Sequence, residues 1–360
     1  MAVKYLAGNR IQGTNAERVA TSLPSGTYTG WKEIGRTTLS SAGDVIDVGS
    51  LPNKRYYMVI RNIIGGDGNM AVYNRLNGDT GSNYAYRQSE NSATDSTANS
   101  QNMVVYDTGG DANDKFDITY ISNLAGGEKL AIGHGINRNS SGSGGKPKMG
   151  EFTWKWANTS NAISAINTFN DTNSQSGNFN TGSEVVVLGY DPTDTNTSNF
   201  WEQLASVSGD GTSNTLSTGT TIGKKYLWIQ AYLETTGQQK GMFRVGNGSV
   251  DASGDYAFRI SNNGGTYAGH DVKNSFTEDM PNALHHFVNI FAINNASSEG
   301  LFIGHDVGVV TTGAGNAPIR QEFVGKWANT SNQFNILDVV SGSGDGNWSS
   351  NAKLRVWGAD

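Results

Sequence analysis

A seven-residue phrase that occurs twice is the feature that most constrains how this chain can fold. Residues Lys155–Asn161 read KWANTSN, and the same seven letters return at Lys326–Asn332, 171 positions later. Chance does not repeat a tryptophan-containing heptapeptide within 360 residues. A long internal period indicates that one structural unit has been copied. We therefore expect a tandem pair of equivalent domains.

Shorter phrases extend this period over most of the chain. Ile132–His134 is answered by Ile303–His305 at an offset of 171 residues. Lys54–Ile60 is answered by Lys224–Gln230 at an offset of 170. Because the offset drifts by only a few residues, we expect the length differences to fall in loops.

The start of the chain has no counterpart in the second unit. We predict an N-terminal arm at residues 1–28, a first domain at residues 29–191 and a second domain at residues 192–360. Within the arm, Thr14–Glu17 fits a capping box, which predicts one short helix at about Asn15–Ala20. An arm of this kind docks on a partner, caps the first domain or stays loosely packed.

Composition and apolar patterning predict an all-β fold. The chain has 47 glycines and 6 prolines, and only 16% of its residues are charged. Polar, glycine-rich turns separate short apolar runs such as Arg55–Asn62 and Glu184–Gly189. In Tyr226–Leu233, aliphatic residues alternate with aromatic and polar ones, so one face packs inward and the other meets solvent or a neighbour. About eight short strands per unit predict two β-sandwich, jelly-roll-like domains.

Bulk properties exclude several classes of protein. A formal net charge of −6 gives no basic surface for nucleic acid. The absence of cysteine excludes disulfides and thiolate metal sites. No apolar run approaches the ~20 residues that span a bilayer, so we expect no membrane insertion. The first ten residues lack the apolar stretch of a signal peptide.

Four aromatic residues are candidates for binding a sugar ring. Trp156 and Trp327 lie at the centre of the repeated phrase, and Trp228 and Tyr232 lie on the aromatic face of one predicted strand. Lectins stack sugar rings on such side chains. The alternative is a core tryptophan followed by a turn of Asn, Thr and Ser. Retention of the tryptophan in both units favours this structural interpretation.

Histidines and oxygen-rich turns are the candidate metal ligands. His134 and His305 end equivalent strands, whereas His285–His286 are adjacent and would point to opposite faces of a strand. Zinc needs several converging ligands, so we expect no zinc site. The turns Asp67–Asn69 and Asp111–Asp114 could hold calcium, yet Asp and Asn also form ordinary turns. We expect no cofactor, with structural calcium as the alternative.

Carboxylates also recur at the repeat spacing. Glu128 corresponds to Glu299, and Glu151 corresponds to Glu322. Glycoside hydrolysis needs two carboxylates that face each other across a cleft. A carboxylate present in each unit is more simply a structural hydrogen-bond acceptor. No nucleophile elbow, phosphate-binding loop or zinc-protease motif is present, so we expect a non-enzymatic protein.

Several phrases resemble virion proteins. The leader Lys4–Thr14, followed by Glu17–Arg18, resembles the opening of virion structural proteins from marine tailed phages and related environmental viruses. The phrases Ser82–Arg87, Ile121–Leu124 and Lys326–Asn332 resemble those of tandem-repeat proteins from the same viruses. The resemblance implies a virion component and supplies no catalytic residue.

The resemblance implies a phage virion surface protein, either a tail-fibre or appendage protein for host attachment or a capsid decoration protein. Such a protein assembles in the host cytoplasm and ends on the exterior of the virion. Its expected partners are other virion proteins at the N-terminal arm, further copies of itself in a homo-oligomer, and a host surface glycan. The alternatives are a free carbohydrate-binding, lectin-like module and a polysaccharide depolymerase.

Overall fold

The fold of the described residues consists of β-strands. The computed structural model describes residues 30–105, 110–170, 175–194, 199–265, 268–278, 280–342 and 346–360. Every regular element within these ranges is a strand, so they contain no helix that could cross a membrane. The all-β prediction is therefore confirmed. The predicted arm and its short helix lie outside the described residues.

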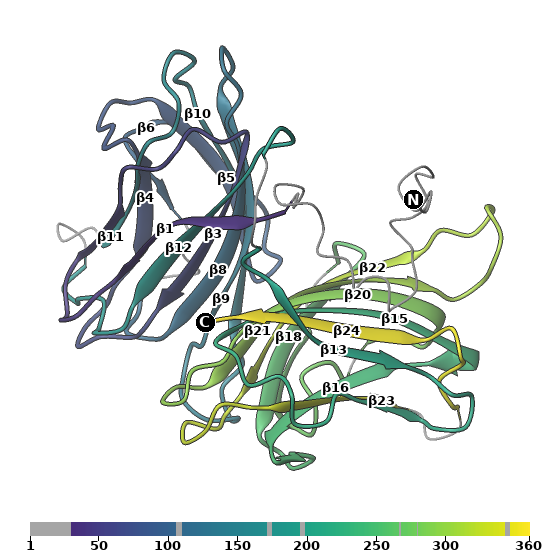
Figure 1. Ribbon diagram of the computed structural model, residues 1–360. Helices are drawn as coiled ribbons and strands as arrows, with labels where there is room; N and C mark the ends of the chain where they lie inside the picture. Colours follow the sequence, from purple (N-terminus) through teal and green to yellow (C-terminus); the bar gives the residue numbers. More distant parts are fainter. Residues whose placement is uncertain are drawn as a thin grey trace, which may run out of the picture.

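The first half of the chain forms an eight-stranded sheet and a four-stranded sheet, which together we call the first sandwich (Figure 1). The large sheet has the order β1-β12-β3-β8-β9-β10-β5-β6 and the small sheet the order β2-β11-β4-β7. The strands are β1 (Lys32–Thr38), β2 (Val45–Val48), β3 (Tyr56–Ile63), β4 (Val72–Leu76), β5 (Tyr84–Glu90), β6 (Ser96–Gln101), β7 (Val104–Val105), β8 (Lys115–Ser122), β9 (Lys129–Asn137), β10 (Lys148–Trp156), β11 (Ile166–Asn170) and β12 (Glu184–Tyr190).

The second half forms the second sandwich, again from one eight-stranded and one four-stranded sheet. The orders are β13-β24-β15-β20-β21-β22-β18-β19 and β14-β23-β16-β17. The strands are β13 (Glu202–Ser208), β14 (Thr215–Ser217), β15 (Tyr226–Gln239), β16 (Gly241–Asn247), β17 (Ser249–Val250), β18 (Tyr256–Asn262), β19 (Ala268–Lys273), β20 (Ala283–Ile293), β21 (Gly300–Val309), β22 (Ile319–Trp327), β23 (Ile336–Ser341) and β24 (Lys353–Ala359). The edge strand of the small sheet differs between the halves. In the second sandwich β17 pairs with β16, the strand just before it in sequence, whereas in the first sandwich β7 pairs with β4 and is separated from it in sequence by β5 and β6.

Alternation along the strands explains how each large sheet packs on its small sheet. In β12, Val185 and Val187 belong to the core between the two sheets, together with Val59 of β3 and Ile166 of β11. In the second sandwich, Leu227 and its alternate neighbours in β15 do the same. Successive side chains of a strand point to opposite faces, so the intervening residues lie on the outer face of the large sheet.

The outer faces of the two large sheets are joined by a third apolar cluster, which we call the junction. Met58 and Leu188 of the first sandwich pack there with Phe291, Leu301 and Ile303 of the second. The strands β3 and β12 are therefore buried on both faces, which explains why their sequences are largely apolar, apart from the buried Arg61, Asn62 and Glu184. In Figure 1 the sandwiches meet where β9 approaches β21.

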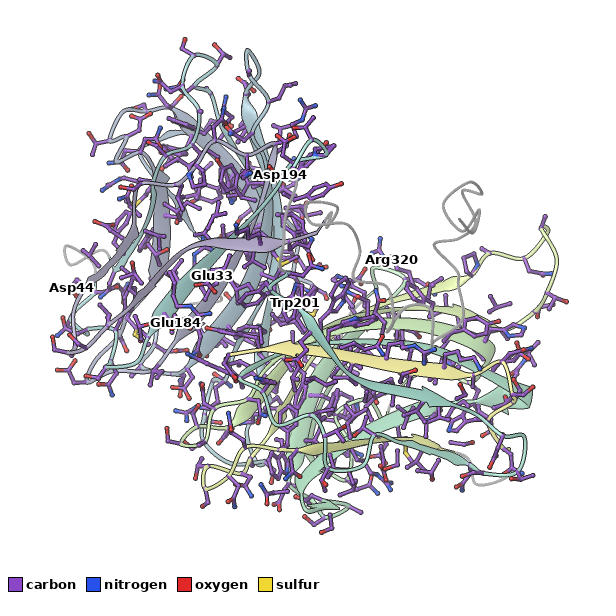
Figure 2. All side chains as sticks on the ribbon, in the orientation of Figure 1. Glu33, Asp44, Glu184, Asp194, Trp201 and Arg320 are labelled. Carbon is purple, nitrogen blue, oxygen red and sulfur yellow. The ribbon has the colours of Figure 1, made fainter. Side chains whose placement is uncertain are left out.

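A charged group tethers the sandwiches beside this cluster. Glu184 at the start of β12 accepts hydrogen bonds from the Tyr226 hydroxyl at 2.5 Å and from Lys225 Nζ at 2.9 Å. Arg36 of the first sandwich also pairs with Glu184, at 3.1 Å. Figure 2 shows Glu184 and Trp201 on the side where the two sandwiches meet. Hydrogen bonds to a buried charge of this kind resist separation of the halves.

Candidate functional site

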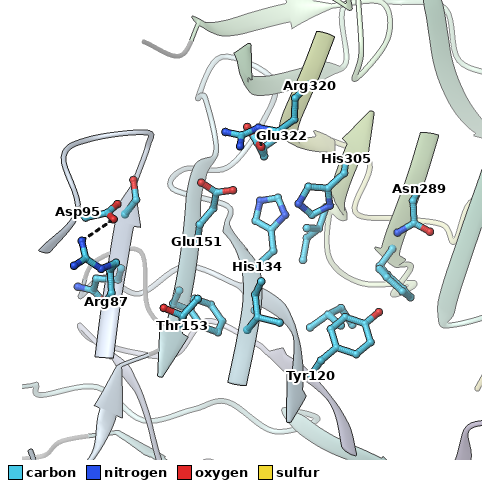
Figure 3. A pocket seen from close by; sticks show the side chains of 18 residues that line it. Arg87, Asp95, Tyr120, His134, Glu151, Thr153, Asn289, His305, Arg320 and Glu322 are labelled. Atoms are coloured by element: carbon cyan, nitrogen blue, oxygen red, sulfur yellow. Dashed lines mark hydrogen bonds and ion pairs between the residues drawn. The ribbon is translucent and has the colours of Figure 1, made fainter. Parts of the chain in front are cut away.

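A cavity of about 520 Å³ opens between the outer faces of the two large sheets, beside the junction (Figure 3). Strands β5, β8, β9 and β10 form one wall and β20, β21 and β22 form the other. Concave sites of this size with a few convergent polar groups are where small ligands bind. The cavity is therefore the candidate site.

Two equivalent His–Glu pairs line this cavity. His134 of β9 lies opposite Glu151 of β10, and His305 of β21 lies opposite Glu322 of β22. The rings of His134 and His305 meet across the junction, with their centroids 4.7 Å apart. Figure 3 shows the two imidazoles side by side, with Glu151 next to His134 and Glu322 next to Arg320. Residues that the repeat places 171 positions apart thus share one site.

The repeated Ile-Gly-His phrase has a local packing reason. A Cβ on Gly133 would lie 2.1 Å from the ring of Phe152, and one on Gly304 would lie 2.2 Å from the ring of Phe323. Both rings belong to the sandwich cores. Glycine is needed on the inner face so that the ring can pack across the strand. The histidine that follows then points to the outer face.

The two histidines differ in exposure, but both have a lowered pKa, which favours the neutral imidazole. His134 is buried, and neither of its ring nitrogens has a hydrogen-bond partner among the described residues. Burial lowers the pKa of His134 well below its usual value, and His305 adds to the effect. His305 is exposed at the edge of the cavity, yet the protein around it and the charge of Arg320 lower its pKa too. Neutral imidazole both donates and accepts a hydrogen bond.

The pKa values of the two carboxyl groups, Glu151 and Glu322, are raised, whereas those of the histidines are lowered. Burial raises the pKa of Glu151, the charge of Glu322 raises it further, and Arg320 opposes this. Burial also raises the pKa of Glu322, although Arg320 Nε lies 2.6 Å from its Oε1. Ionisable groups with shifted pKa values that converge on a cavity are typical of functional sites.

Aromatic and amide groups complete the walls. Tyr120 projects into the open part of the cavity opposite Asn289 (Figure 3). Asn289 is held by Trp228, whose Nε1 donates to Asn289 Oδ1 at 2.7 Å. Arg87 pairs with Asp95 at 3.1 Å at the far side. The cavity therefore offers an aromatic face next to hydrogen-bonding groups.

Trp156 and Trp327 are core residues. Each is buried within its own sandwich. Trp156 Nε1 donates to Asp79 at 2.7 Å, and Trp327 Nε1 donates to Asp251 at 2.8 Å. Because a ligand cannot reach either ring, neither can be the sugar platform considered above.

Trp228 and Tyr232 lie at different depths on the outer face of β15. Trp228 packs among aromatic rings at the edge of the junction, stacked on Phe291 with centroids 5.7 Å apart. Tyr232 is exposed, and its hydroxyl lies 3.2 Å from His285 Nδ1. Of the two, Tyr232 presents a ring to solvent, whereas Trp228 orients Asn289.

The other suggested metal ligands already have protein partners. His286 is buried and bonds Asp306 at 2.9 Å, on the face opposite to His285. In the turns considered for calcium, Asp111 pairs with Lys115 at 3.1 Å and Asp114 pairs with Arg138 at 3.3 Å. Within the described ranges, no group of three or more His, Asp or Glu residues is arranged to hold a metal ion.

Glu128 and Glu299 make equivalent ion pairs. Glu128 pairs with Lys155 at 2.9 Å on the surface, and Glu299 pairs with Lys326 at 3.3 Å where both are buried. Both carboxylates accept hydrogen bonds, Glu128 from Lys155 Nζ and Glu299 from Gly142 N–H. Glu151 and Glu322 instead line one cavity, which the repeat spacing alone does not predict. Their shared offset with the two Ile-Gly-His phrases was the available signal.

Comparisons with known proteins give no family and only solved structures of low sequence identity. No protein-family model matches the chain, and no curated protein matches it significantly. Among solved structures it is similar to domains LG4-5 of the mouse laminin alpha1 chain, at 11% identity, a TM-score of 0.15 and coverage of 92% of this chain and 91% of that one. It is also similar to the LG1-3 region of the laminin alpha2 chain, at 7% identity, a TM-score of 0.21 and coverage of 88% and 64%. Neisserial surface protein A (NspA) follows at 7% identity, a TM-score of 0.13 and coverage of 80% and 99%.

Proposed function

We propose that this chain is a non-enzymatic, lectin-like binding protein, built from two copies of one sandwich domain, whose cavity binds a glycan. The observation that carries the proposal is the cavity, where the Tyr120 ring lies near Asn289 and the paired carboxyl groups. Sugars present apolar C–H faces and many hydroxyls, so they need an aromatic ring beside donors and acceptors. The identical order of strands in the two large sheets supports the copying.

The polar groups of the cavity suit a neutral, hydroxyl-bearing ligand. His134 has two unsatisfied ring nitrogens, and a buried polar group without a partner costs about 1–3 kcal/mol. A ligand hydroxyl, which donates and accepts, would satisfy a nitrogen once the His134 ring has turned towards the cavity, because both nitrogens are buried. Glu151 and Glu322 with raised pKa values can accept or donate in the same way. A strongly charged ligand would gain less, because Arg320 already pairs with Glu322.

The test is glycan binding by the full chain. We expect the wild type to bind members of a broad glycan array, and Tyr120→Ala and Glu151→Gln to reduce the affinity at least tenfold. Tyr232→Ala serves as the matched control, because Tyr232 is equally exposed but lies farther along β15. Loss of binding in Tyr232→Ala but not in Tyr120→Ala would move the site away from the cavity. Silence across the array would contradict glycan binding, and new reducing ends would indicate a depolymerase instead.

A virion surface role is the second proposal, and it concerns location rather than chemistry. It is supported by the resemblance of Lys4–Thr14 and of the repeated phrase to virion proteins. In this role the arm anchors the chain to the particle, and the sandwiches contact the host or decorate the capsid. Deletion of residues 1–28 should leave both sandwiches folded and abolish incorporation into particles. Normal incorporation of the truncated chain would contradict the anchor.

A further inference from the structure

The cavity is a groove that crosses four strands of the first large sheet. Its lining includes two complete rows of side chains from the outer face of β5, β10, β9 and β8, which are adjacent in that sheet. Neighbouring strands lie about 4.8 Å apart, so the ends of each row are about 14 Å from each other. The groove is therefore longer than a single sugar ring.

The first row forms the open floor of the groove. Arg87 of β5 lies opposite Thr153 of β10. Ile132 of β9 lies between Thr153 and Tyr120 of β8. All four side chains are exposed, Ile132 to 61% and Tyr120 to 37%. The second sandwich thus leaves this row accessible to a ligand along its whole length.

The second row forms the back of the groove, on the side of the second sandwich. Glu151 of β10 lies opposite both Ser89 of β5 and His134 of β9. The His305 ring of the second sandwich contacts His134 there. On the other side of the floor, Leu130 is 56% exposed. A chain that lies on the floor therefore has hydrogen-bonding groups along one flank and solvent along the other.

Aromatic rings continue the floor beyond Tyr120. The Tyr120 ring contacts Trp31, with their centroids 6.2 Å apart. The Tyr190 ring lies 5.8 Å from Trp31 and stacks on Tyr56 at 6.2 Å. Tyr56 is 37% exposed, and Trp31 and Tyr190 are half-buried. The sugar-stacking chemistry proposed for Tyr120 is thus available from three further rings.

Arg87 lies at the opposite end of the floor. Its side chain is 60% exposed and pairs at 3.1 Å with Asp95, which is 46% exposed. A guanidinium has five N–H donors, so Arg87 keeps donors for ligand hydroxyls beside this ion pair. Figure 3 shows Arg87, Thr153 and Tyr120 one after another along the groove. Among the described residues, both ends of the groove therefore lead to exposed side chains.

This arrangement suits a ligand made of repeated neutral units. Recognition of a chain terminus needs a closed end that fits the terminal sugar. A linear sugar chain instead repeats its ring faces and hydroxyls, which match a row of aromatic and hydrogen-bonding side chains. The two arginines of the lining, Arg87 and Arg320, are each paired with a carboxylate, so the groove favours a neutral chain over a charged one.

We propose that the groove binds an internal stretch of a linear, neutral polysaccharide, which lies across β5, β10, β9 and β8 from Arg87 to the rings of Trp31 and Tyr56. This inference rests on the proposed glycan binding and adds the length, the charge and the path of the glycan. Each further sugar unit contacts another strand or ring, so the affinity rises with chain length until the groove is filled. The ends of the sugar chain lie outside the groove and do not contribute.

The first experiment is calorimetric titration of the full chain with linear gluco-, chito-, xylo- and manno-oligosaccharides of two to six units. We expect one series to bind, with an affinity that rises about tenfold or more from the disaccharide to the hexasaccharide, as one or two further aromatic contacts would give. Reduction of the terminal sugar to its alditol should leave the hexasaccharide affinity unchanged. Equal affinity at all lengths, or lost affinity after reduction, overturns the proposal.

Two variants test the ends of the groove. Arg87→Ala and Tyr56→Ala should each lower the hexasaccharide affinity about two- to tenfold, the size of one lost polar or aromatic contact, and leave the disaccharide affinity unchanged. Arg75→Ala and Tyr232→Ala are the matched controls, because Arg75 lies on β4 of the small sheet and Tyr232 on β15, outside the lining. Unchanged melting temperatures would show that the variants keep their fold.

The extended groove and the glycan site can fail separately. If Tyr120→Ala loses binding at every length while Arg87→Ala and Tyr56→Ala keep the hexasaccharide affinity, the glycan site stands and the extended chain is overturned. Binding of a short, branched glycan on the array, with none of the four linear series bound, also overturns the extended chain alone. Silence in both experiments overturns both proposals.

Discussion

His134 and His305, which occupy equivalent strands of the two sandwiches, lie with their ring centroids 4.7 Å apart at the junction. Burial lowers the pKa of His134 in the folded chain, and His305 adds to this. The unfolded chain therefore binds more protons below the ordinary histidine value of about 6.5. The stability contributed by neutral His134 is complete above that pH and is lost as the pH falls below it.

We predict that acidification from pH 7 to pH 5 destabilises the wild-type chain more than it destabilises His134→Gln. The carboxyl groups of Glu151 and Glu322 oppose the trend, because their raised pKa values favour the folded chain at low pH. Comparison with His134→Gln removes the contribution of these two carboxyl groups, because both proteins contain them. Each unit of pKa difference is worth about 1.4 kcal/mol. Urea unfolding at pH 7, 6 and 5 measures the effect, and coincident profiles would contradict it.

Arg61 forms a buried ionic network in the first sandwich that the second sandwich lacks. Its guanidinium is fully buried and donates to Asp117 at 2.7 Å and to Thr119 at 3.1 Å. At the equivalent positions the second sandwich has Ala231, Val288 and Ile290, all buried in its core. The same site is thus occupied once by ions and once by apolar side chains.

We predict that Arg61→Ala destabilises the chain by about 3–5 kcal/mol, because it leaves the Asp117 carboxylate buried without its cation. The triple change Arg61→Ala, Asp117→Val and Thr119→Ile gives these three positions the residues of the second sandwich. It leaves the buried Thr168 and Asn74, which also accept hydrogen bonds from Arg61, without that donor, so it should recover part of the loss. Denaturant unfolding of both variants decides, and a triple variant as unstable as the single one would refute the exchange.

Gly133 provides a packing test. A methyl group there would meet the Phe152 ring at 2.1 Å, so Gly133→Ala should cost about 1–3 kcal/mol through overpacking. Adding Phe152→Leu should recover part of the loss. Gly144→Ala is the control, since a Cβ there meets nothing within 4 Å. Equal melting temperatures for Gly133→Ala and the control would show that the strand tolerates the clash.

Trp156→Phe should lower the stability of the chain without changing its affinity for a glycan. The change removes the hydrogen bond to Asp79, and such a bond contributes about 1.5–3 kcal/mol when its acceptor is charged. Glycan affinity of the folded variant should equal that of the wild type, because the ring is buried away from the cavity. Calorimetric titration of the folded protein checks this, and a lost affinity would restore Trp156 as a binding candidate.

Strongly apolar strands were predictable from sequence, and polar edge strands were not. Arg55–Asn62 and Glu184–Gly189 match β3 and β12 to within one residue at each end. The strand β6, with the sequence STANSQ, has no apolar alternation, because it lies at a sheet edge. Such strands depend on neighbouring backbone rather than on their own side chains. Each half therefore has more strands than the eight or so that were expected.

The site was only half predictable, for a related reason. The histidines and carboxylates were visible as repeated residues, yet their meeting depends on how two outer sheet faces pack over long sequence distance. Trp228 showed the same limit: the alternation along β15 placed it outward, but not against Phe291 of the adjacent strand. Local patterns give the face of a side chain, whereas tertiary packing gives its neighbours.

The double burial of β3 and β12 has a consequence during synthesis. When the first sandwich leaves the ribosome, its outer apolar face has no cover, since the residues that cover it are translated later. At about 5–20 residues per second, the second half takes on the order of ten to thirty seconds to follow. For that interval the nascent chain carries an adhesive sheet surface, which makes the growing polypeptide a natural client for ribosome-associated chaperones.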